Sequence, residues 1–142
     1  VGLMGVLADA AIAARAPVVG VIPRFLFQLE VAHPGINALE VVETFAERKQ
    51  RMGELSDAFL SLPGGVGTMD ELFEAWSWTH ARLQDKPSGL LNAAGYYDDL
   101  VAFLERAVAD GLLQQQTRNL LAVGADPVVL LDTLDREAAR RN

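Results

Sequence analysis

The fold is decided by one stretch near the middle of the chain, Ala58-Phe59-Leu60-Ser61-Leu62-Pro63-Gly64-Gly65-Val66-Gly67-Thr68-Met69-Asp70-Glu71. Its first five residues form a short, mostly apolar run, which is typical of a strand buried in a parallel sheet. A proline and two glycines then end the strand. Apolar residues spaced by three and four predict a helix over residues 68–83. A strand, a glycine turn and a helix in this order indicate an α/β fold.

The rest of the chain continues this alternation of strands and helices. No repeat and no linker interrupts it, so we expect a single domain over residues 1–142, layered as α/β with a mostly parallel sheet. The helix after the second strand is expected to begin with a capping box formed by Thr44 and Glu47. The other expected elements are strands over 18–22, 39–42, 88–91 and 120–123, and helices over 3–14, 44–55, 97–109 and 127–140.

The composition narrows the classes of partner and site. With 142 residues, 51% of them hydrophobic, the chain can bury a sizeable core. Its formal charge of −7 argues against nucleic-acid binding, which needs a basic surface. There is no cysteine, which excludes disulfides, thiolate nucleophiles and cysteine-ligated metals. Two histidines, His33 and His80, make a histidine-rich metal site improbable, and we expect no metal.

No targeting or membrane signal stands out. No run approaches the roughly 20 apolar residues that a membrane span needs. The first residues lack the basic segment and cleavage site of a secretory signal. We therefore expect a cytoplasmic protein without membrane association.

The glycine turn has the properties of an anion site. Its three glycines let a ligand approach the backbone closely, and the helix start behind them offers unpaired amides and the positive end of a dipole. No lysine follows the glycines, as a Walker A loop requires, and Asp70 stands where the dinucleotide fingerprint has its third glycine. The turn therefore predicts a locally held phosphate rather than ATP hydrolysis or NAD binding.

Two charged motifs each allow two interpretations. Thr68 and Glu71 match a capping box, but a carboxylate one turn from a phosphate can also stabilise positive charge on a ribose or orient a water. Arg48 and Lys49 fit a solvated helix face, but an arginine can also clamp a phosphate or a sugar hydroxyl with its forked donors. The residues alone leave both alternatives open.

Five short motifs occur together in the order and spacing of one family: Gly2-Leu3-Met4-Gly5, Glu47-Arg48-Lys49, the stretch from Pro63 to Glu71, Lys86-Pro87 and Gly95-Tyr96-Tyr97-Asp98. With them the chain resembles the LOG ("lonely guy") family of cytokinin riboside 5′-monophosphate phosphoribohydrolases, some of whose relatives carry the label possible lysine decarboxylase. The resemblance runs from the first residue to beyond residue 120. It implies a Rossmann-like three-layer fold and a homodimer, with no cofactor.

The resemblance also implies an activity and residue roles. The reaction would hydrolyse the N-glycosidic bond of an N6-modified adenosine 5′-monophosphate, giving free base and ribose 5-phosphate. Arg48 and Glu71 would be catalytic, and Glu30 and Ser77 would make further polar contacts. Lys49 and the turn residues Gly64, Gly65, Val66, Gly67 and Thr68 would bind the nucleotide and its phosphate.

Some features depart from the family or leave alternatives open. Phe45-Ala46 stands where the family usually has Met-His, so base preference or rate could differ. Nothing marks Lys49 or Lys86 as a Schiff-base lysine, so the decarboxylase label has no support. An AMP nucleosidase and a non-catalytic nucleotide-binding module remain alternatives. His80 is expected to be packed or at the surface, and the aromatic residues Phe73, Trp76 and Trp78 to lie in the core or in a subunit interface.

The beginning of the chain gives one further expectation. In the LOG family, Gly-Leu-Met-Gly closes a glycine-rich loop that follows a strand, whereas here this motif starts at Gly2. A sheet without its incoming strand would leave an apolar edge uncovered. We therefore expect N-terminal strands and a nucleotide-contacting loop to precede Val1.

Overall fold

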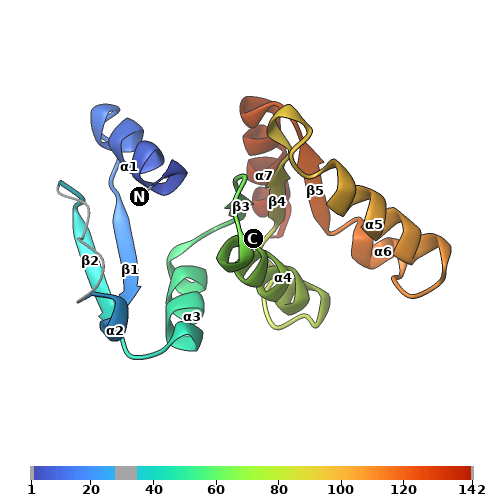
Figure 1. The fold of residues 1–142 in the computed structure, drawn as a ribbon, viewed down its shortest axis with the longest axis horizontal. Helices are drawn as coiled ribbons and strands as arrows, with labels where there is room; N and C mark the ends of the chain where they lie inside the picture. Colours follow the sequence, from blue (N-terminus) through green and yellow to red (C-terminus); the bar gives the residue numbers. More distant parts are fainter. Residues whose placement is uncertain (1, 28–34, 142) are drawn as a thin grey trace. The chain divides into compact units, whose positions relative to one another are not determined.

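The computed structural model describes residues 2–27 and 35–141, which form helices and parallel strands (Figure 1). The chain divides into two compact units, Val1–Ser56 and Asp57–Asn142. Each unit has a parallel sheet of its own, of two strands in the first and three in the second. The α/β class and the parallel pairing confirm the predicted fold class. Among the described residues, no helix combines the length and apolar character needed to cross a bilayer.

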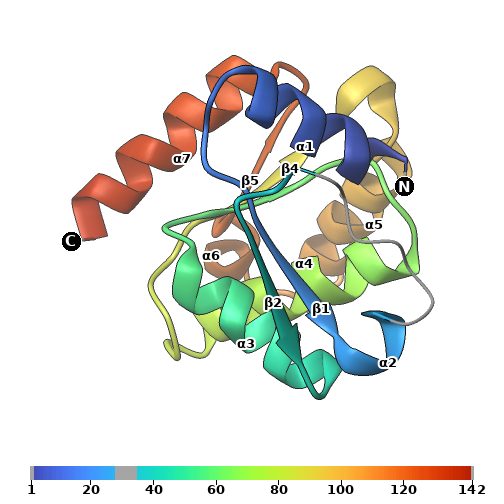
Figure 2. The ribbon, with the colours of Figure 1, turned by 90° about the vertical axis from the view of Figure 1, so that its left-hand side faces the viewer.

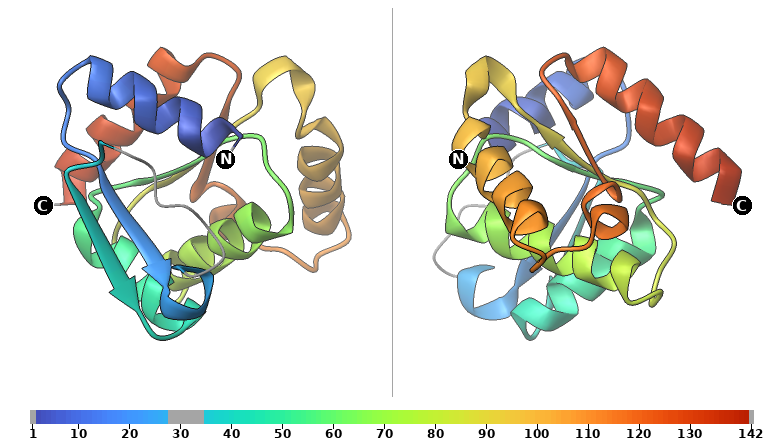
Figure 3. Two further views of the ribbon diagram at one scale, coloured as in Figure 1. Left: turned by 60° about the vertical axis from the view of Figure 1, so that its left-hand side comes forward. Right: turned by 90° about the vertical axis from the view of Figure 1, so that its right-hand side faces the viewer.

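The first unit is built around a pair of parallel strands. These strands lie side by side in Figure 2 and in the left panel of Figure 3, with Val19 opposite Ala38 and Pro23 opposite Val42. The first strand was predicted over residues 18–22, and the structure shifts it by one residue, so that the buried Pro23 is its last residue. The elements are α1 (Leu3–Ala13), β1 (Val19–Pro23), α2 (Arg24–Phe27), β2 (Ala38–Val42) and α3 (Phe45–Leu55).

Polar contacts cap the start of α3 and join this helix to β2. The Thr44 side chain accepts a hydrogen bond from the Glu47 amide, which confirms the predicted cap. The Glu47 carboxylate reaches back to the amide of Glu43, one residue earlier than in the standard capping box. Arg51 on α3 holds the Glu40 carboxylate of β2 through two nitrogens, Nε at 2.5 Å and Nη2 at 3.0 Å. This ion pair holds the pKa of Glu40 below its ordinary value.

The second unit contains the other three strands, which pair in the order β3-β4-β5. All pairs are parallel, so the three carboxyl ends lie at the same edge of the sheet. The elements are β3 (Phe59–Ser61), α4 (Val66–His80), β4 (Ser88–Leu91), the short 3-10 helix η1 (Ala93–Gly95), α5 (Asp98–Ala109), α6 (Gln115–Arg118), β5 (Leu121–Gly124) and α7 (Pro127–Arg141).

Side chains alternate across the central strand β4 and pack against helices on both sides. Leu90 is fully buried in a core cluster whose other buried members are Leu72, Trp76, Tyr97, Leu104 and Leu121. On the opposite face, a Cβ added at Gly89 would lie 2.9 Å from Leu134 Cδ1, so α7 lies directly on the strand there. Figure 3 shows α7 (red) and α5 (orange) in this unit. The sheet therefore lies between two helical layers, and the core assignment of Trp76 is confirmed.

Several helices and strands begin or end at residues other than those predicted from the sequence. Strand β3 has three residues instead of five, and α4 begins at Val66 and ends at His80 instead of spanning 68–83. Arg82 takes a positive φ of 58°, which an α-helix cannot contain. The short helices α2, η1 and α6 were not predicted, because three or four residues carry no helical periodicity.

Candidate active site at a glycine loop

The glycine turn joins the carboxyl end of β3 to the start of α4. Residues 62–65 form the connection, and the segments after β4 and β5 leave the same edge of the parallel sheet. In open α/β sheets, ligands bind in the crevice outside the carboxyl ends of the strands. The loop predicted to hold a phosphate is therefore at the edge of this unit where such sheets carry their sites.

Helix α4 begins without a side-chain cap. Gly65 is the N-cap residue, and the first helical hydrogen bond runs from the Met69 N–H to Gly65 O, with 3.1 Å between the two atoms. The amides of the first turn have no acceptor inside a helix, and together with the dipole they favour an anion. Thr68 is the third helical residue and Glu71 the sixth, so these two residues do not form a capping box. That interpretation of Glu71 is wrong.

The three glycines of the loop differ in whether neighbouring atoms leave room for a side chain. A Cβ at Gly64 would lie 2.8 Å from the Thr68 Cβ, so packing against Thr68 demands a glycine there. Apart from the adjacent residues and the backbone of α4 itself, a Cβ at Gly65 or Gly67 would have no atom of the described residues within 4 Å, and neither φ is positive. Neither backbone shape nor packing within the described residues calls for these two glycines. They leave the loop amides open to a molecule approaching from outside.

Two adjacent tyrosines hold the carbonyl groups of the loop. The Tyr97 hydroxyl donates to Leu62 O at 2.7 Å, and the Tyr96 hydroxyl donates to Gly64 O at 2.9 Å. Their rings meet edge to face at 4.8 Å. Tyr97 is 4% exposed and Tyr96 57% exposed. Burial raises the pKa of Tyr97, an effect that its hydrogen bonding with the Gly64 backbone partly offsets.

A polar network positions the tyrosine pair. The Asn92 side chain accepts from Tyr97 N at 2.6 Å and donates to Asp98 Oδ1 at 2.7 Å, and its amide donates to Gly124 O at 2.8 Å. Gly95 adopts a φ of +72°, and a Cβ there would lie 2.5 Å from Asp98 Oδ2. Asn92 thus ties the end of β4 to the end of β5 and to the start of α5.

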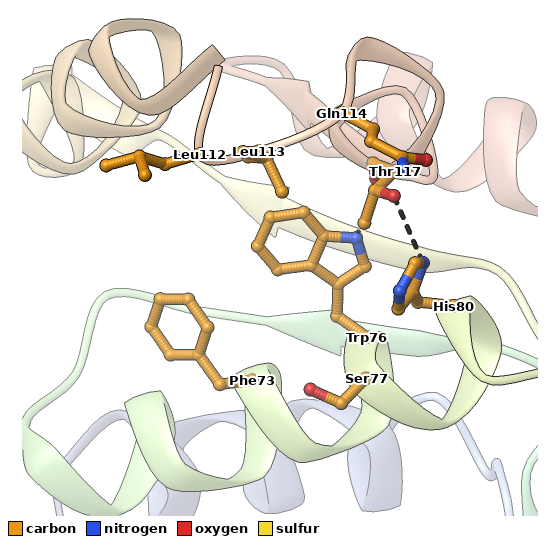
Figure 4. A pocket seen from close by; sticks show the side chains of 8 residues that line it. All are labelled: Phe73, Trp76, Ser77, His80, Leu112, Leu113, Gln114 and Thr117. Carbon is orange, nitrogen blue, oxygen red and sulfur yellow. Dashed lines mark hydrogen bonds between the residues drawn. The ribbon is translucent and has the colours of Figure 1, made fainter. Parts of the chain in front are cut away.

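The helix α4 carries Glu71 and Ser77 to different places. Glu71 is half-buried, about 9 Å along the helix from Gly65. Ser77 lies about 9 Å further and about 120° around the axis. It lines a hollow of about 340 Å³ with Phe73, Trp76, His80 and Thr117 among its walls (Figure 4). The structure thus places Ser77 in this hollow, away from the glycine loop, and its contact with a nucleotide stays a prediction.

Two hydrogen bonds join His80, Trp76 and Thr117 in the wall of this hollow. His80 Nδ1 lies 3.0 Å from Thr117 Oγ1, the dashed line in Figure 4, and Trp76 Nε1 donates to Thr117 O at 2.9 Å. His80 is therefore a surface histidine held by a neighbour, as expected. Across the part of the chain that the structure describes, no three His, Asp or Glu residues gather as metal ligands would.

The remaining candidates belong to the first unit or to undescribed residues. Arg48 and Lys49 are half-buried in the second turn of α3. The nearby Arg51 is committed to the carboxylates of Glu40 and Glu54. Glu30 and His33 lie outside the described residues. Arg48 and Glu71 belong to different units, so a site that joins them is a proposal.

Comparison with known proteins identifies the family. The family model described as "Possible lysine decarboxylase" matches residues 4–134. The chain belongs to this family. It is 46% identical over 127 residues to a cytokinin riboside 5′-monophosphate phosphoribohydrolase of Rhodococcoides fascians, covering 89% of the chain and 64% of the relative. It is 36% identical over 135 residues to an Arabidopsis thaliana protein of the same description, covering 95% of the chain and 63% of the relative.

These matches confirm the resemblance to the LOG family. The chain spans less than two thirds of the length of both relatives. In this family member, sequence reasoning missed the bracing of the loop by Tyr96, Tyr97 and Asn92. A signal was present, because the motif Gly95-Tyr96-Tyr97-Asp98 places two adjacent tyrosine hydroxyls just before a helix. The partners of the two hydroxyls, more than 30 residues earlier, could not be read from it.

Proposed function

We propose that the chain carries the hydrolytic centre of a nucleoside 5′-monophosphate phosphoribohydrolase. Its substrates would be N6-modified adenosine 5′-monophosphates, and its products the free base and ribose 5-phosphate. The observation that carries the proposal is the uncapped start of α4, with open glycines followed by Glu71, in a chain 46% identical to a relative named for this reaction. The names of the relatives support this activity over the decarboxylation in the family description.

The 5′-phosphate would lie against the start of α4. The backbone of Gly64, Gly65, Val66, Gly67 and Thr68 would surround it, with amide donors and the positive end of the helix dipole facing the phosphoryl oxygens. Because the net charge of the chain is −7, this local arrangement has to supply the attraction. Lys49 would add a positive charge, and Glu30 and Ser77 further polar contacts.

Glu71 and Arg48 would act on the ribose. Cleavage of the bond between C1′ and the base sends the bonding electrons to the base and leaves oxocarbenium charge on the sugar. A carboxylate beside the ribose stabilises this charge where it develops. It can also accept a proton from the water that attacks C1′, and the departing base takes up one proton to become the neutral free base. The forked guanidinium of Arg48 would hold a phosphate or hydroxyl oxygen and keep the sugar aligned.

The test measures release of base and ribose 5-phosphate from N6-isopentenyl-AMP. Glu71→Gln removes the charge and the basic oxygen, and we expect a loss of about 10²- to 10⁴-fold in kcat. The thermal stabilisation by phosphate should survive, because the loop amides are untouched. Asp70→Asn is the matched control, with the same charge change on the exposed neighbouring residue. Full activity in Glu71→Gln would contradict the catalytic assignment.

The same assay separates the alternative functions. Equal turnover of AMP and of its N6-modified analogues would favour a plain AMP nucleosidase. Saturable binding of both without any ribose 5-phosphate would favour a non-catalytic nucleotide-binding module. A homodimer and a cytoplasmic location complete the proposal, and the molar mass in solution tests the first of these.

A further inference from the structure

The hydroxyl of Tyr96 reaches the glycine loop from a distant part of the sequence. It donates to Gly64 O at 2.9 Å across a separation of 32 residues. The tyrosine itself is 57% exposed, so this is not a bond of the buried core. A hydrogen bond at the surface adds little to folding because water can replace it. Its main consequence is the orientation that it gives to the loop backbone.

Peptide geometry makes this bond control an amide. The carbonyl of Gly64 and the N–H of Gly65 belong to one planar trans peptide unit, in which the two groups point in opposite directions. Holding the carbonyl toward Tyr96 therefore directs the Gly65 N–H to the other side. Both flanking residues are glycines, which rotate with little steric cost. Without the hydroxyl, this peptide unit loses the hydrogen bond from Tyr96 that holds its carbonyl.

The directed amide stands at the start of α4. Gly65 is the N-cap residue, and its N–H adjoins the open amides of the first helical turn. Several N–H groups pointing at one place bind an anion, and turning one of them away weakens that site. We infer that Tyr96 is a positioning residue, which aims the Gly65 amide at the phosphoryl group of the substrate. This inference rests on the proposed function.

Tyr97 offers a contrast within the same motif. Its hydroxyl holds the carbonyl of Leu62, whose peptide unit contains the nitrogen of Pro63. A proline nitrogen carries no hydrogen, so the bond to Leu62 O directs no amide, and the other backbone partner of the Tyr97 hydroxyl is Gly64 and not Gly65. Removal of the Tyr97 hydroxyl should therefore affect the stability of the fold. Removal of the Tyr96 hydroxyl should affect phosphate recognition.

The experiment compares Tyr96→Phe with the unaltered protein on two substrates. One is N6-isopentenyl-AMP, and the other is its riboside, which lacks the 5′-phosphate. We expect kcat/KM for the nucleotide to fall roughly three- to tenfold, mainly through KM, with little change for the riboside. The Kd for ribose 5-phosphate, measured by calorimetry, should rise by a similar factor. In Tyr97→Phe the preference for the nucleotide over the riboside should change less.

The outcomes separate this inference from the function itself. An equal loss on both substrates, or an unchanged Kd for ribose 5-phosphate in Tyr96→Phe, would overturn the positioning role. A protein that releases no base, but whose affinity for ribose 5-phosphate depends on Tyr96, would refute the hydrolytic function and keep the positioning role. Failure of the unaltered protein to bind ribose 5-phosphate would overturn the positioning role as well.

Discussion

Removing the hydroxyl of Tyr97 should cost the fold about 1–2 kcal/mol. Tyr97 is 4% exposed, and its hydroxyl donates to Leu62 O at 2.7 Å. In Tyr97→Phe the carbonyl of the half-buried Leu62 loses this donor, and an unsatisfied buried acceptor costs about 1–3 kcal/mol. We take the lower part of this range because the hydrogen bond is only partly buried. The ring itself is retained, so its packing in the core cluster that also contains Leu72 and Leu104 should not change.

The assay is equilibrium unfolding in urea, followed by circular dichroism, on the unaltered protein and on both phenylalanine variants. Tyr96→Phe makes the same chemical change at an exposed ring and should cost less than about 0.5 kcal/mol, because water can reach the Gly64 carbonyl. Equal stability losses in the two variants, or no loss in Tyr97→Phe, would refute the claim that the buried Tyr97 hydroxyl stabilises the fold more than the exposed Tyr96 hydroxyl does.

The same tyrosine predicts a pH dependence. Burial raises the pKa of Tyr97 above its ordinary value of 10.0, so the folded protein keeps the phenolic proton to higher pH than the unfolded chain does. The contribution of this group to stability is complete below about pH 10 and is lost as the pH rises through the folded pKa. Tyr97→Phe should flatten this part of the stability profile. A profile that is identical in the two proteins would contradict the argument.

Three further predictions concern the loop and the first unit. Gly67→Ala should raise the free energy of unfolding by about 0.5–1 kcal/mol, because the added Cβ meets open space in a helix; urea unfolding measures this. The same substitution should weaken the binding of ribose 5-phosphate, which calorimetry measures. Gly64→Ala should instead destabilise the protein by about 1–3 kcal/mol in the same unfolding assay, because its Cβ would collide with Thr68. Arg51 lowers the pKa of Glu40. The stability that this ion pair contributes is therefore present above the ordinary pKa of Glu40 and is lost as the pH falls through its lowered pKa in the folded protein. Glu40→Gln should remove this loss of stability at acid pH, which unfolding curves taken between pH 2 and 7 would show.

Sequence patterns located most of the elements because each signal is local. The strand over residues 88–91 and the cap at Thr44 depend on neighbouring residues only, and both were found. The start of α4 was misplaced by two residues because Thr68 with Glu71 imitates a capping box. The structure begins the helix at Val66, since the chain can turn into it at the uncapped Gly65. The local sequence allows a helix start at either Thr68 or Val66, and the path of the backbone decides between them.

The sequence by itself determined the α/β class, the parallel strands and the glycine loop before a helix that carries Glu71. These follow from apolar periodicity, turn residues and short motifs, all of which act over a few residues. Only the tertiary structure decided that Glu71 is no cap, that Gly64 is required by Thr68, and that Tyr96 and Tyr97 hold the loop. The reason is physical: a hydrogen bond across more than 30 residues depends on how strands align at a sheet edge, which no local pattern specifies.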